Sequence, residues 1–268
     1  MTIDLSGKTV LVTGGAGTGV GSGVCEAVAA AGARLLINDV RAAEAEAAAQ
    51  KYSNAFAIPG DISQADQVQA MFDVIKKEFG AIQGLVNNAG VGLTKPFQEA
   101  TVPDFERIYG INVQGLWMMS RAFVNQLTAA RAEGCIVNVS SVHAKSTADH
   151  YVLYASTKAA IEGLTRGMAV ELGRAGVRCN AIGPGYVHAE QNLELLKNIS
   201  HDPQQWVDTY RTEYQSAPSL IEARDCGNVV AFLLSDLSRA ITGQVLYVDR
   251  GLTSMLFSRS FMNKNDTL

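Results

Sequence analysis

Short apolar segments alternate with longer amphipathic segments along the whole chain, and this alternation restricts the fold more than any other feature of the sequence. The short segments cover residues 9–13, 34–39, 55–58, 82–86, 135–139, 177–182 and 244–248. The longer segments have helical character and cover residues 20–31, 41–51, 64–79, 103–130, 151–173 and 222–235. Strands that are joined by helical crossovers pair in parallel and are covered on both faces. We therefore predict an α/β fold with a seven-stranded parallel sheet and helices on both faces.

The chain shows no Pro/Ser-rich linker, charge block or internal repeat, so residues 1–268 are predicted to form a single domain. Residues 189–219 differ from the rest, because two short predicted helices carry Trp206, Tyr210 and Tyr214 between the sixth strand and the last long helix. We interpret this segment as a substrate lid. The terminal residues 257–268 are expected to form a tail that packs on a partner subunit.

The composition is that of a globular small-molecule enzyme rather than a nucleic-acid-binding protein. Hydrophobic residues make up 47% of the chain, and the formal net charge of -4 leaves no basic stripe for a nucleic acid. The first residues lack a signal-peptide pattern, and no apolar run is long enough to span a bilayer, so we expect a cytoplasmic protein without a membrane partner. The four scattered cysteines are expected to be free thiols and not metal ligands.

A glycine-rich loop connects the first predicted strand to the first helix. Residues 13–21 read Thr-Gly-Gly-Ala-Gly-Thr-Gly-Val-Gly. Glycine has no Cβ, which allows the backbone to turn tightly and to approach a pyrophosphate at the positive end of a helix. A strand, a glycine loop and a helix in this order indicate a doubly wound, Rossmann-type dinucleotide-binding fold.

Asp39 ends the second predicted strand, eighteen residues after Gly21. A carboxylate at this point accepts hydrogen bonds from the adenosine ribose hydroxyls and repels a 2′-phosphate. NAD is therefore the predicted cofactor, although Arg41 can attract a phosphate and NADP stays open. Asp61, after the third strand, is predicted to accept a hydrogen bond from the adenine amino group.

Tyr154 and Lys158 lie four residues apart on one predicted helix, thirteen residues after Ser141. A neighbouring ammonium stabilises a phenolate, so we expect Lys158 to lower the pKa of Tyr154 and to make it a proton shuttle. Tyr and Lys at this spacing also recur by chance on amphipathic helices, so the pair needs the support of the other motifs.

Those motifs resemble the short-chain dehydrogenase/reductase family over essentially the whole chain. Besides the glycine loop and the Tyr154/Lys158 pair, they are Asn87-Asn88-Ala89-Gly90, Asn112-Val113-Gln114-Gly115, Ser140-Ser141, Pro184-Gly185 and Val248-Asp249. These motifs appear in the order of the family's motifs and near their spacing. The resemblance therefore implies a hydride-transfer enzyme.

The resemblance implies a catalytic tetrad of Asn112, Ser141, Tyr154 and Lys158. Tyr154 is expected to act as acid or base at the substrate oxygen, Ser141 to bind that oxygen, Lys158 to hold the nicotinamide ribose, and Asn112 to anchor a water in the proton path. The implied cofactor contacts are Gly15, Gly19, Val20, Gly21, Asp39, Asp61, Ile62, Asn88, Tyr154, Lys158, Pro184, Gly185 and Val187. Dimers or tetramers are implied as well, and the small residues Ala155, Ala159 and Gly163 permit close packing against a second subunit.

Three positions depart from the family pattern. The glycine loop is one residue longer, which predicts a bulge in its first turn. Ala189 stands where the family often has a threonine that faces the nicotinamide amide. Arg250 replaces the first of two glycines that commonly follow the last strand, and we assign it to the subunit interface.

Polar and aromatic residues flank the predicted centre and are candidates for the substrate pocket. They are His143, Tyr151, Tyr186, His188 and Trp206. A sugar or polyol suits this mixture. The leading prediction is hydride transfer between NAD(H) and a secondary alcohol or ketone. The alternatives are an NADP-dependent carbonyl or 3-oxoacyl reductase, a non-catalytic dinucleotide-sensing regulator and, less favoured, a methyltransferase.

Overall fold

The fold is taken from a computed structural model, which describes residues 2–197 and 200–262. Seven parallel strands form one sheet in the order β3-β2-β1-β4-β5-β6-β9. The strands are β1 Thr9–Thr13, β2 Arg34–Asn38, β3 Ala55–Ala57, β4 Gly84–Asn87, β5 Gly134–Val139, β6 Val177–Pro184 and β9 Val245–Val248. The predicted doubly wound, seven-stranded α/β fold is confirmed, with strand ends shifted by one or two residues.

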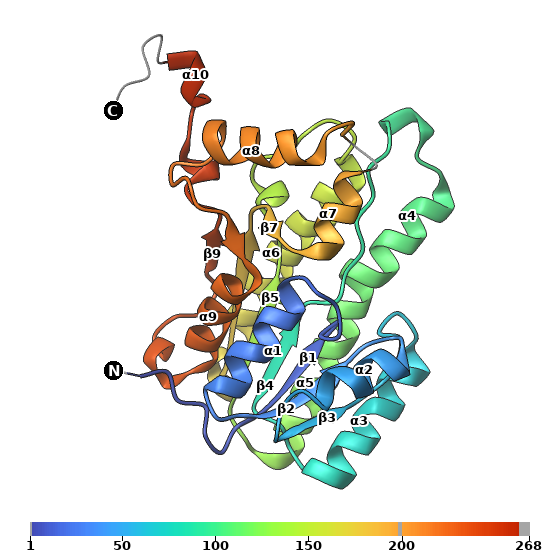
Figure 1. The fold of residues 1–268 in the computed structure, drawn as a ribbon. Helices are drawn as coiled ribbons and strands as arrows, with labels where there is room; N and C mark the ends of the chain where they lie inside the picture. Colours follow the sequence, from blue (N-terminus) through green and yellow to red (C-terminus); the bar gives the residue numbers. More distant parts are fainter. Residues whose placement is uncertain (1, 198–199, 263–268) are drawn as a thin grey trace.

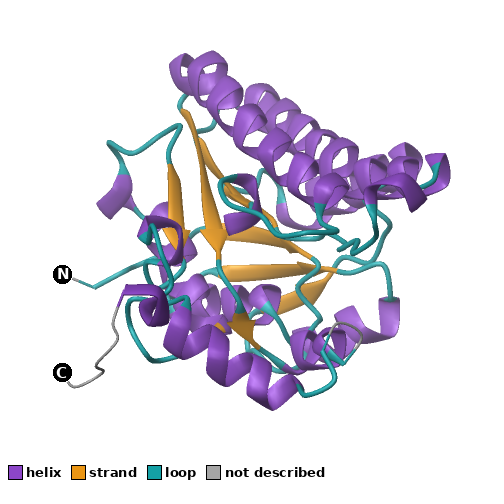
Figure 2. Cartoon of the chain, turned by 90° about the horizontal axis from the view of Figure 1, so that it is seen from above, coloured by secondary structure: helices purple, strands orange, loops and turns teal. Residues whose placement is uncertain are grey.

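Helices cover both faces of the sheet, as Figure 2 shows from above. One apolar cluster packs α1 (Val20–Ala30), α2 (Ala42–Ala49) and α9 (Ala223–Leu234) on one face. A second cluster packs α3 (Ala65–Phe79), α5 (Leu116–Ala130) and α6 (Val152–Leu172) on the other. Along β1, Val10 and Val12 belong to the first cluster and Leu11 to the second, because successive side chains of a strand point to opposite faces. This explains the continuous apolar run.

The single helix predicted over residues 103–130 is wrong, because the chain forms three consecutive segments there. α4 (Val102–Tyr109) passes into a π-helical segment, η2 (Gly110–Gly115), which passes into α5. Thr101 caps α4 by accepting a hydrogen bond from Asp104 N. A π-helical turn inserts one extra residue per turn and occurs mostly at functional sites. Asn112 lies inside this turn.

Helices α1 and α9 lie side by side (Figure 1) and approach each other through glycines. A Cβ at Gly227 would overlap the backbone of Gly23, and a Cβ at Gly23 would overlap the backbone of Ala223. Only glycine allows this distance between the two helix backbones. The contact fixes the helix that follows the glycine loop.

The chain forms two further short helices, which were predicted, and a small second sheet, which was not. α7 (Glu190–Leu196) and α8 (Pro203–Glu213) are the two short helices expected in residues 189–219, and they lie beyond the carboxyl ends of the strands (Figure 1). Strands β7 (Val187–His188) and β8 (Ile221–Glu222) pair in parallel on either side of this segment, which the sequence did not indicate. The remaining elements are α10 (Arg259–Met262) and the short 3-10 helices Phe97–Glu99, Val142–Ala144, Gly173–Ala175, Asp236–Ser238 and Leu252–Ser254.

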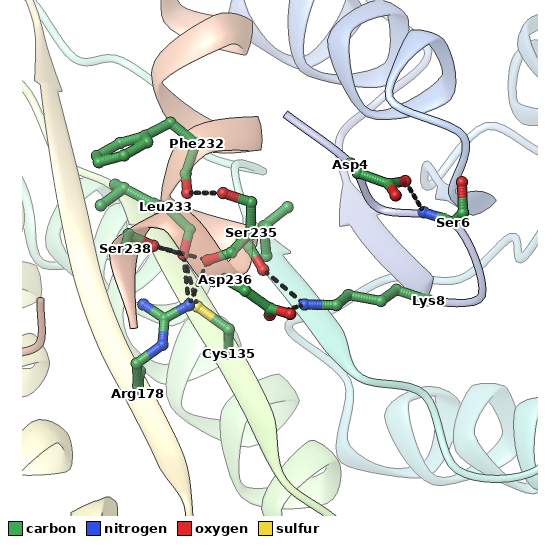
Figure 3. A network of polar contacts seen from close by, with 11 residues as sticks. Asp4, Ser6, Lys8, Cys135, Arg178, Phe232, Leu233, Ser235, Asp236 and Ser238 are labelled. Atoms are coloured by element: carbon green, nitrogen blue, oxygen red, sulfur yellow. Dashed lines mark hydrogen bonds and ion pairs between the residues drawn. The ribbon is translucent and has the colours of Figure 1, made fainter. Parts of the chain in front are cut away.

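A polar network closes the carboxyl end of α9 near the points where β5 and β6 begin (Figure 3). The Arg178 guanidinium donates to Leu233 O at 2.7 Å, and Ser238 Oγ donates to the same oxygen at 2.8 Å. Lys8 Nζ lies 2.6 Å from Asp236 Oδ1. Cations and hydrogen-bond donors satisfy the last carbonyls of a helix and oppose its dipole.

Within residues 2–197 and 200–262, no helix has the length and apolarity that crossing a bilayer requires. The four cysteines are free and buried.

Candidate active site

Ser141 and Tyr154 meet at the carboxyl edge of the sheet. Ser141 follows β5 and caps the short helix Val142–Ala144, where its Oγ accepts a hydrogen bond from His143 N at 3.2 Å. Tyr154 lies in the first turn of α6, and its hydroxyl interacts with the Ser141 side chain. Two hydroxyl groups are thus placed where one oxygen atom of a ligand could contact both.

Burial raises the pKa of Tyr154, and the interaction with the Ser141 side chain opposes this shift. The net shift is therefore opposite to the lowered pKa that the sequence predicts for Tyr154. The Lys158 ammonium donates to Val139 O at 2.9 Å and lies 5.6 Å from the Tyr154 ring centroid. Loss of water around the phenol is the largest cause of the raised pKa of Tyr154.

Lys158 is itself buried, with 6% of its surface exposed, and burial lowers its pKa to about 8. An ammonium in this environment gives up its proton more readily than a solvated one. The side chain is therefore suited to accept and release protons near neutral pH.

Asn112 connects three segments of the site. Its Oδ1 accepts from Val91 N at 2.8 Å, and its Nδ2 donates to Val91 O at 2.9 Å and to Thr157 Oγ1 at 3.1 Å. The π-helical turn therefore holds the loop after β4 against α6, between Tyr154 and Lys158. Asn112 Oδ1 also faces Gly90, where an added Cβ would lie 3.2 Å from it and 3.7 Å from Lys158 Nζ.

Ser140 and Ser141 have different partners. Ser140 Oγ lies 3.2 Å from Lys158 O and 3.2 Å from Glu162 Oε1, so it is directed at the body of α6. Ser141 is directed at Tyr154. This geometry favours Ser141 as the residue that contacts a ligand.

The glycine loop forms a close-fitting cradle at the start of α1. Gly14 has a φ of +63°, which accommodates the additional residue of the loop. A Cβ at Gly21 would overlap Gly14 O and lie 2.6 Å from Asn88 Nδ2, and a Cβ at Gly15 would lie 2.9 Å from Cys25 Sγ. Gly19 caps α1, and the first turn, which begins at Val20, contains no acidic residue.

Asn88 ties this loop to β4. Its Nδ2 donates to Thr13 O at 2.9 Å and to Gly14 O at 3.0 Å. The side chain therefore shapes the cradle from beneath, whereas the resemblance implied a contact with the cofactor. The positive end of α1 and the compact glycine backbone fit a pyrophosphate.

Asp39 directly follows β2, is 7% exposed and accepts hydrogen bonds from its near neighbour Arg41. Arg41 N and Nε lie 3.2 Å and 3.3 Å from Asp39 Oδ1. The Arg41 guanidinium also lies 2.6 Å from Glu44 Oε2. Two carboxylates thus contact the cation that could attract a 2′-phosphate here.

Asp61 and Ile62 are engaged within the protein. Asp61 Oδ1 accepts hydrogen bonds from Ser63 N and Ser63 Oγ at 2.8 Å and 2.7 Å. The Ile62 side chain is buried and faces Gly115 at the end of the π-helical turn. A contact between Ile62 and a cofactor would therefore use its main chain.

The Pro-Gly turn ends β6 beside the last strand. Pro184 pairs with Val248, and Gly185 N donates to Val248 O at 3.0 Å. The side chain of Val187 is buried in the core, and its carbonyl accepts from Asn192 Nδ2 at 2.7 Å. Ala189 caps α7 without a side-chain hydrogen bond.

The predicted substrate residues form two aromatic clusters. In the first, the ring of His143 stacks on Tyr151 at 4.5 Å and meets the edge of Tyr154 at 5.5 Å. In the second, Tyr186 contacts His188 at 6.5 Å and Trp206 at 5.1 Å between ring centroids. The first cluster thus includes Tyr154 itself.

Polar atoms in the second cluster are buried without a hydrogen-bond partner in the described part of the chain. They are Tyr186 Oη and His188 Nδ1, and Gln215 carries two more. Tyr210 stacks on Trp206 at 5.1 Å and accepts a hydrogen bond from Tyr186 N at 3.1 Å. Buried polar groups normally find partners, so these atoms are suited to bind a hydroxylated ligand.

Arg250 makes contacts within its own chain and keeps 34% of its side chain exposed, so its place at a subunit interface stays a prediction. Its guanidinium lies 3.3 Å from Leu220 O and 3.4 Å from Asp225 Oδ2, and its carbonyl accepts from Ser216 N at 2.9 Å. A φ of +51° places the residue in this turn. Arg250 therefore holds the end of the 189–219 segment against the last strand.

The described part of the 257–268 tail packs on α8 of the same chain. Arg259 donates to Ser216 O at 2.5 Å, and Ser260 N donates to Glu213 Oε2 at 2.8 Å. Residues 263–268 lie outside the described residues.

Thr157, Glu162 and Gln215 were not identified from the sequence. Thr157 and Glu162 share a helix with Tyr154 and Lys158, so helical spacing could have indicated them as supporting groups. Gln215 had no such signal, because its burial depends on how the 189–219 segment folds back.

The arrangement can transfer a proton at an oxygen atom next to a cradle for a dinucleotide. The Tyr154 hydroxyl, the Ser141 hydroxyl and the Lys158 ammonium supply the polar groups, and the glycine loop supplies the cradle. Within residues 2–197 and 200–262, no group of three or more His, Cys, Asp or Glu side chains is placed to hold a metal ion.

Comparison with known proteins agrees with this chemistry. A family model described as Enoyl-(Acyl carrier protein) reductase matches residues 15–253. The chain is 31% identical over 252 residues to 5-keto-D-gluconate 5-reductase of Escherichia coli K12, which covers 92% of this chain and 96% of that protein. It is 32% identical over 260 residues to L-rhamnose 1-dehydrogenase (NAD(P)(+)) of Sphingomonas sp. SKA58, covering 92% and 97%.

A solved structure has the same fold. Gluconate 5-dehydrogenase from Burkholderia cenocepacia, in complex with NADP and tartrate, superposes with a TM-score of 0.86 at 29% identity and covers 95% of this chain and 98% of that one. The chain belongs to the short-chain dehydrogenase/reductase family and is an NAD(P)-dependent oxidoreductase that acts on CH-OH groups.

Proposed function

We propose that the enzyme interconverts a secondary alcohol and a ketone of a sugar or polyol at Tyr154. The observation that carries this proposal is the juxtaposition of the Ser141 and Tyr154 side chains beside the buried Lys158. The sugar-related names of the two curated relatives support the substrate class. The nicotinamide ring, when bound, supplies or accepts the hydride.

The protein groups handle the substrate oxygen and its proton. Tyr154 donates its hydroxyl proton to the oxygen during reduction and receives it back during oxidation. Ser141 donates a hydrogen bond to the same oxygen and stabilises the charge that develops on it. Because the pKa of Tyr154 is raised, its hydroxyl stays protonated until the proton passes to the substrate oxygen.

In this proposal Lys158 reprotonates Tyr154 after the substrate oxygen has taken its proton. Its pKa of about 8 is closer to neutral pH than that of a solvated lysine, so the ammonium can lose and regain a proton during turnover. Asn112 holds α6 through Thr157 and places both residues. A water that is anchored in the π-helical turn would connect Lys158 to solvent.

Two aromatic clusters supply the walls of the substrate pocket in our proposal. His143 and Tyr151 stack beside Tyr154, while Tyr186, His188 and Trp206 approach from the 189–219 lid. Tyr186 Oη and His188 Nδ1, which have no hydrogen-bond partner among the described residues, would bind substrate hydroxyls. A flat aromatic surface with polar atoms suits a polyhydroxylated ligand.

The preferred cofactor is proposed to be NAD. The Asp39 carboxylate can accept hydrogen bonds from the ribose hydroxyls, and Asp39 and Glu44 both contact Arg41. The structural relative in complex with NADP favours the alternative cofactor, NADP. If NAD is preferred, Asp39→Ala lowers that preference at least ~10-fold, because the carboxylate no longer repels the phosphate. A wild-type preference for NADP that Arg41→Ala abolishes would assign NADP instead.

Turnover measurements test the proposed reaction. We expect activity with a panel of sugar acids, aldoses and polyols in the presence of NAD or NADP, followed by nicotinamide absorbance. Tyr154→Phe keeps the ring but removes the acid, and should lower kcat by about 10²–10⁴-fold. Full activity of Tyr154→Phe would refute the mechanism. Activity confined to 3-oxoacyl thioesters would refute the substrate class.

A homodimer or homotetramer is proposed through the face of α4, α5 and α6. Phe105 and Trp117 are each 45% exposed, and a groove of about 470 Å³ between these helices includes Trp117 and Leu164. Exposed aromatic residues in a patch mark association surfaces. Trp117→Glu should weaken this association, so the mass measured by light scattering should fall below that of the wild-type assembly. Val74→Glu, at a similarly exposed position on α3, should not.

We also propose a cytoplasmic location. The four buried free thiols support it, because such thiols are usual in a reducing compartment. Fractionation of cells that produce the protein checks the location.

A further inference from the structure

Glu162 lies on α6 one turn after Lys158, with 12% of its side chain exposed. Its Oε1 accepts a hydrogen bond from Ser140 Oγ at 3.2 Å and another from Tyr247 Oη at 2.8 Å. The two donors come from the end of β5 and from β9. One carboxylate oxygen therefore joins the catalytic helix to two strands of the sheet.

The contact with Ser140 acts on the peptide that carries Ser141. Ser140 N donates to Ile182 O at 2.8 Å on β6, and Ser140 Oγ also lies 3.2 Å from Lys158 O. These contacts hold both the main-chain nitrogen and the side-chain hydroxyl of Ser140. Since Ser141 is the next residue, its hydroxyl position relative to Tyr154 depends on how Ser140 is held against α6.

The contact with Tyr247 holds the carboxylate from the other side. The Tyr247 ring packs directly on Gly183, where a Cβ would lie 2.5 Å from the ring. The Lys145 ammonium lies 5.2 Å from the Tyr247 ring centroid, on the segment that follows His143. Burial, followed by the hydrogen bond to Glu162, raises the pKa of Tyr247, so its hydroxyl stays a donor.

Arg166 faces the other carboxylate oxygen. Its Nη1 lies 3.9 Å from Glu162 Oε2, and its side chain is 60% exposed. An exposed ion pair at this distance contributes little. The two hydrogen bonds on Oε1 are therefore the contacts that give Glu162 its orientation.

We infer that Glu162 is a positioning residue for hydride transfer, which holds Ser140 against α6 and thereby sets the distance between the Ser141 and Tyr154 hydroxyls. This inference rests on the proposed function, because it assumes that these two hydroxyls contact the reacting oxygen. A displacement of a catalytic group by about 1 Å can lower the rate by about 10²-fold.

Steady-state kinetics of substituted enzymes test the inference. Glu162→Ala removes the acceptor and should lower kcat at least ~10-fold, with the KM for the cofactor changed less than ~2-fold. Glu162→Gln keeps an acceptor oxygen and should recover most of that loss. Arg166→Ala, one turn further along α6, should retain wild-type kcat. Equal kcat values for Glu162→Ala and the wild type would overturn the inference.

A double-mutant cycle shows whether Glu162 acts through Ser141. In a Ser141→Ala background, Glu162→Ala should cause little further loss of kcat, since the hydroxyl that it positions is gone. Losses that multiply would mean that Glu162 acts elsewhere and would overturn the inference. Ser140→Ala is the smaller change and should show the same kcat loss. It replaces Glu162→Ala in the test if that variant does not fold. Wild-type kcat in Ser140→Ala would overturn the inference as well.

The same series separates this inference from the proposed function. Full activity of Tyr154→Phe contradicts the proposed function. An inactive Tyr154→Phe enzyme, together with independent effects of Glu162 and Ser141, contradicts only the positioning role.

Discussion

Two neighbouring side chains of the site, Tyr154 and Lys158, are displaced from their ordinary pKa values in opposite directions by the same cause. Burial disfavours the charged form of each group, so it raises the pKa of the phenol and lowers that of the ammonium. Both groups are thereby biased toward their neutral forms. A neutral tyrosine beside a readily deprotonated lysine is an arrangement that stores one proton and can replace it.

The Lys158 shift predicts a pH dependence of stability. Its pKa is about 8 in the folded chain, against an ordinary value of 10.5 for a solvated lysine, so the unfolded chain binds more protons between these values. The free energy of unfolding should therefore rise with pH across this window, relative to a Lys158→Met variant, and the difference should be constant below pH 8. Denaturant unfolding at several pH values between about 7 and 9.5 measures it. Parallel curves for the two proteins would contradict the shift.

Helix α6 carries the proton-transfer residues, and α1 carries the glycine cradle, so the site requires that two helices on opposite faces of the sheet be fixed. The π-helical turn and Thr157 fix α6 through Asn112. The paired glycines of α1 and α9 fix α1. Neither device contributes a group that reacts, but each determines where such groups lie.

Gly227→Ala should destabilise the contact between α1 and α9. The added methyl would overlap the backbone of Gly23, and forced overpacking typically costs about 1–3 kcal/mol. Thermal unfolding should show a lower Tm, and the KM for the cofactor should rise because the glycine loop moves with α1. The same substitution at Gly173, the C-cap of α6 with helical φ and ψ, meets open space and should raise stability by up to about 1 kcal/mol. A Tm for Gly227→Ala at or above the wild-type value would contradict this account.

On the scale of the whole molecule, the last described residues reach back to the proposed lid. Glu213 and Ser216 lie at the end of α8 and beyond it, and Ser260 and Arg259 bind them. The turn at Arg250 holds the same segment from the side of the sheet. The lid is thus attached at its end to two parts of the chain that are distant in sequence.

Glu213→Ala should loosen this attachment. We expect a several-fold higher KM for the sugar or polyol substrate with little change in the KM for the cofactor, because α8 carries Trp206 and Tyr210 of the proposed pocket. Asp208→Ala is the matched control, since it removes a carboxylate from the same helix that bonds only to Arg211 and Gln204 within the described residues. Equal substrate KM values for Glu213→Ala and Asp208→Ala would contradict a role of the attached tail in substrate binding.

The sequence by itself determined the fold class, because alternating apolar strands and amphipathic helices leave few arrangements other than a doubly wound parallel sheet. It also identified Ser141, Tyr154 and Lys158 as a group, since motif order and helical spacing are local properties. Only the tertiary structure decided what surrounds them. Burial reversed the expected pKa shift of Tyr154, the π-helical turn divided the predicted long helix, and Arg250 paired with Asp225. Each of these outcomes depends on contacts between residues far apart in the chain, and spacing along the sequence does not contain that information.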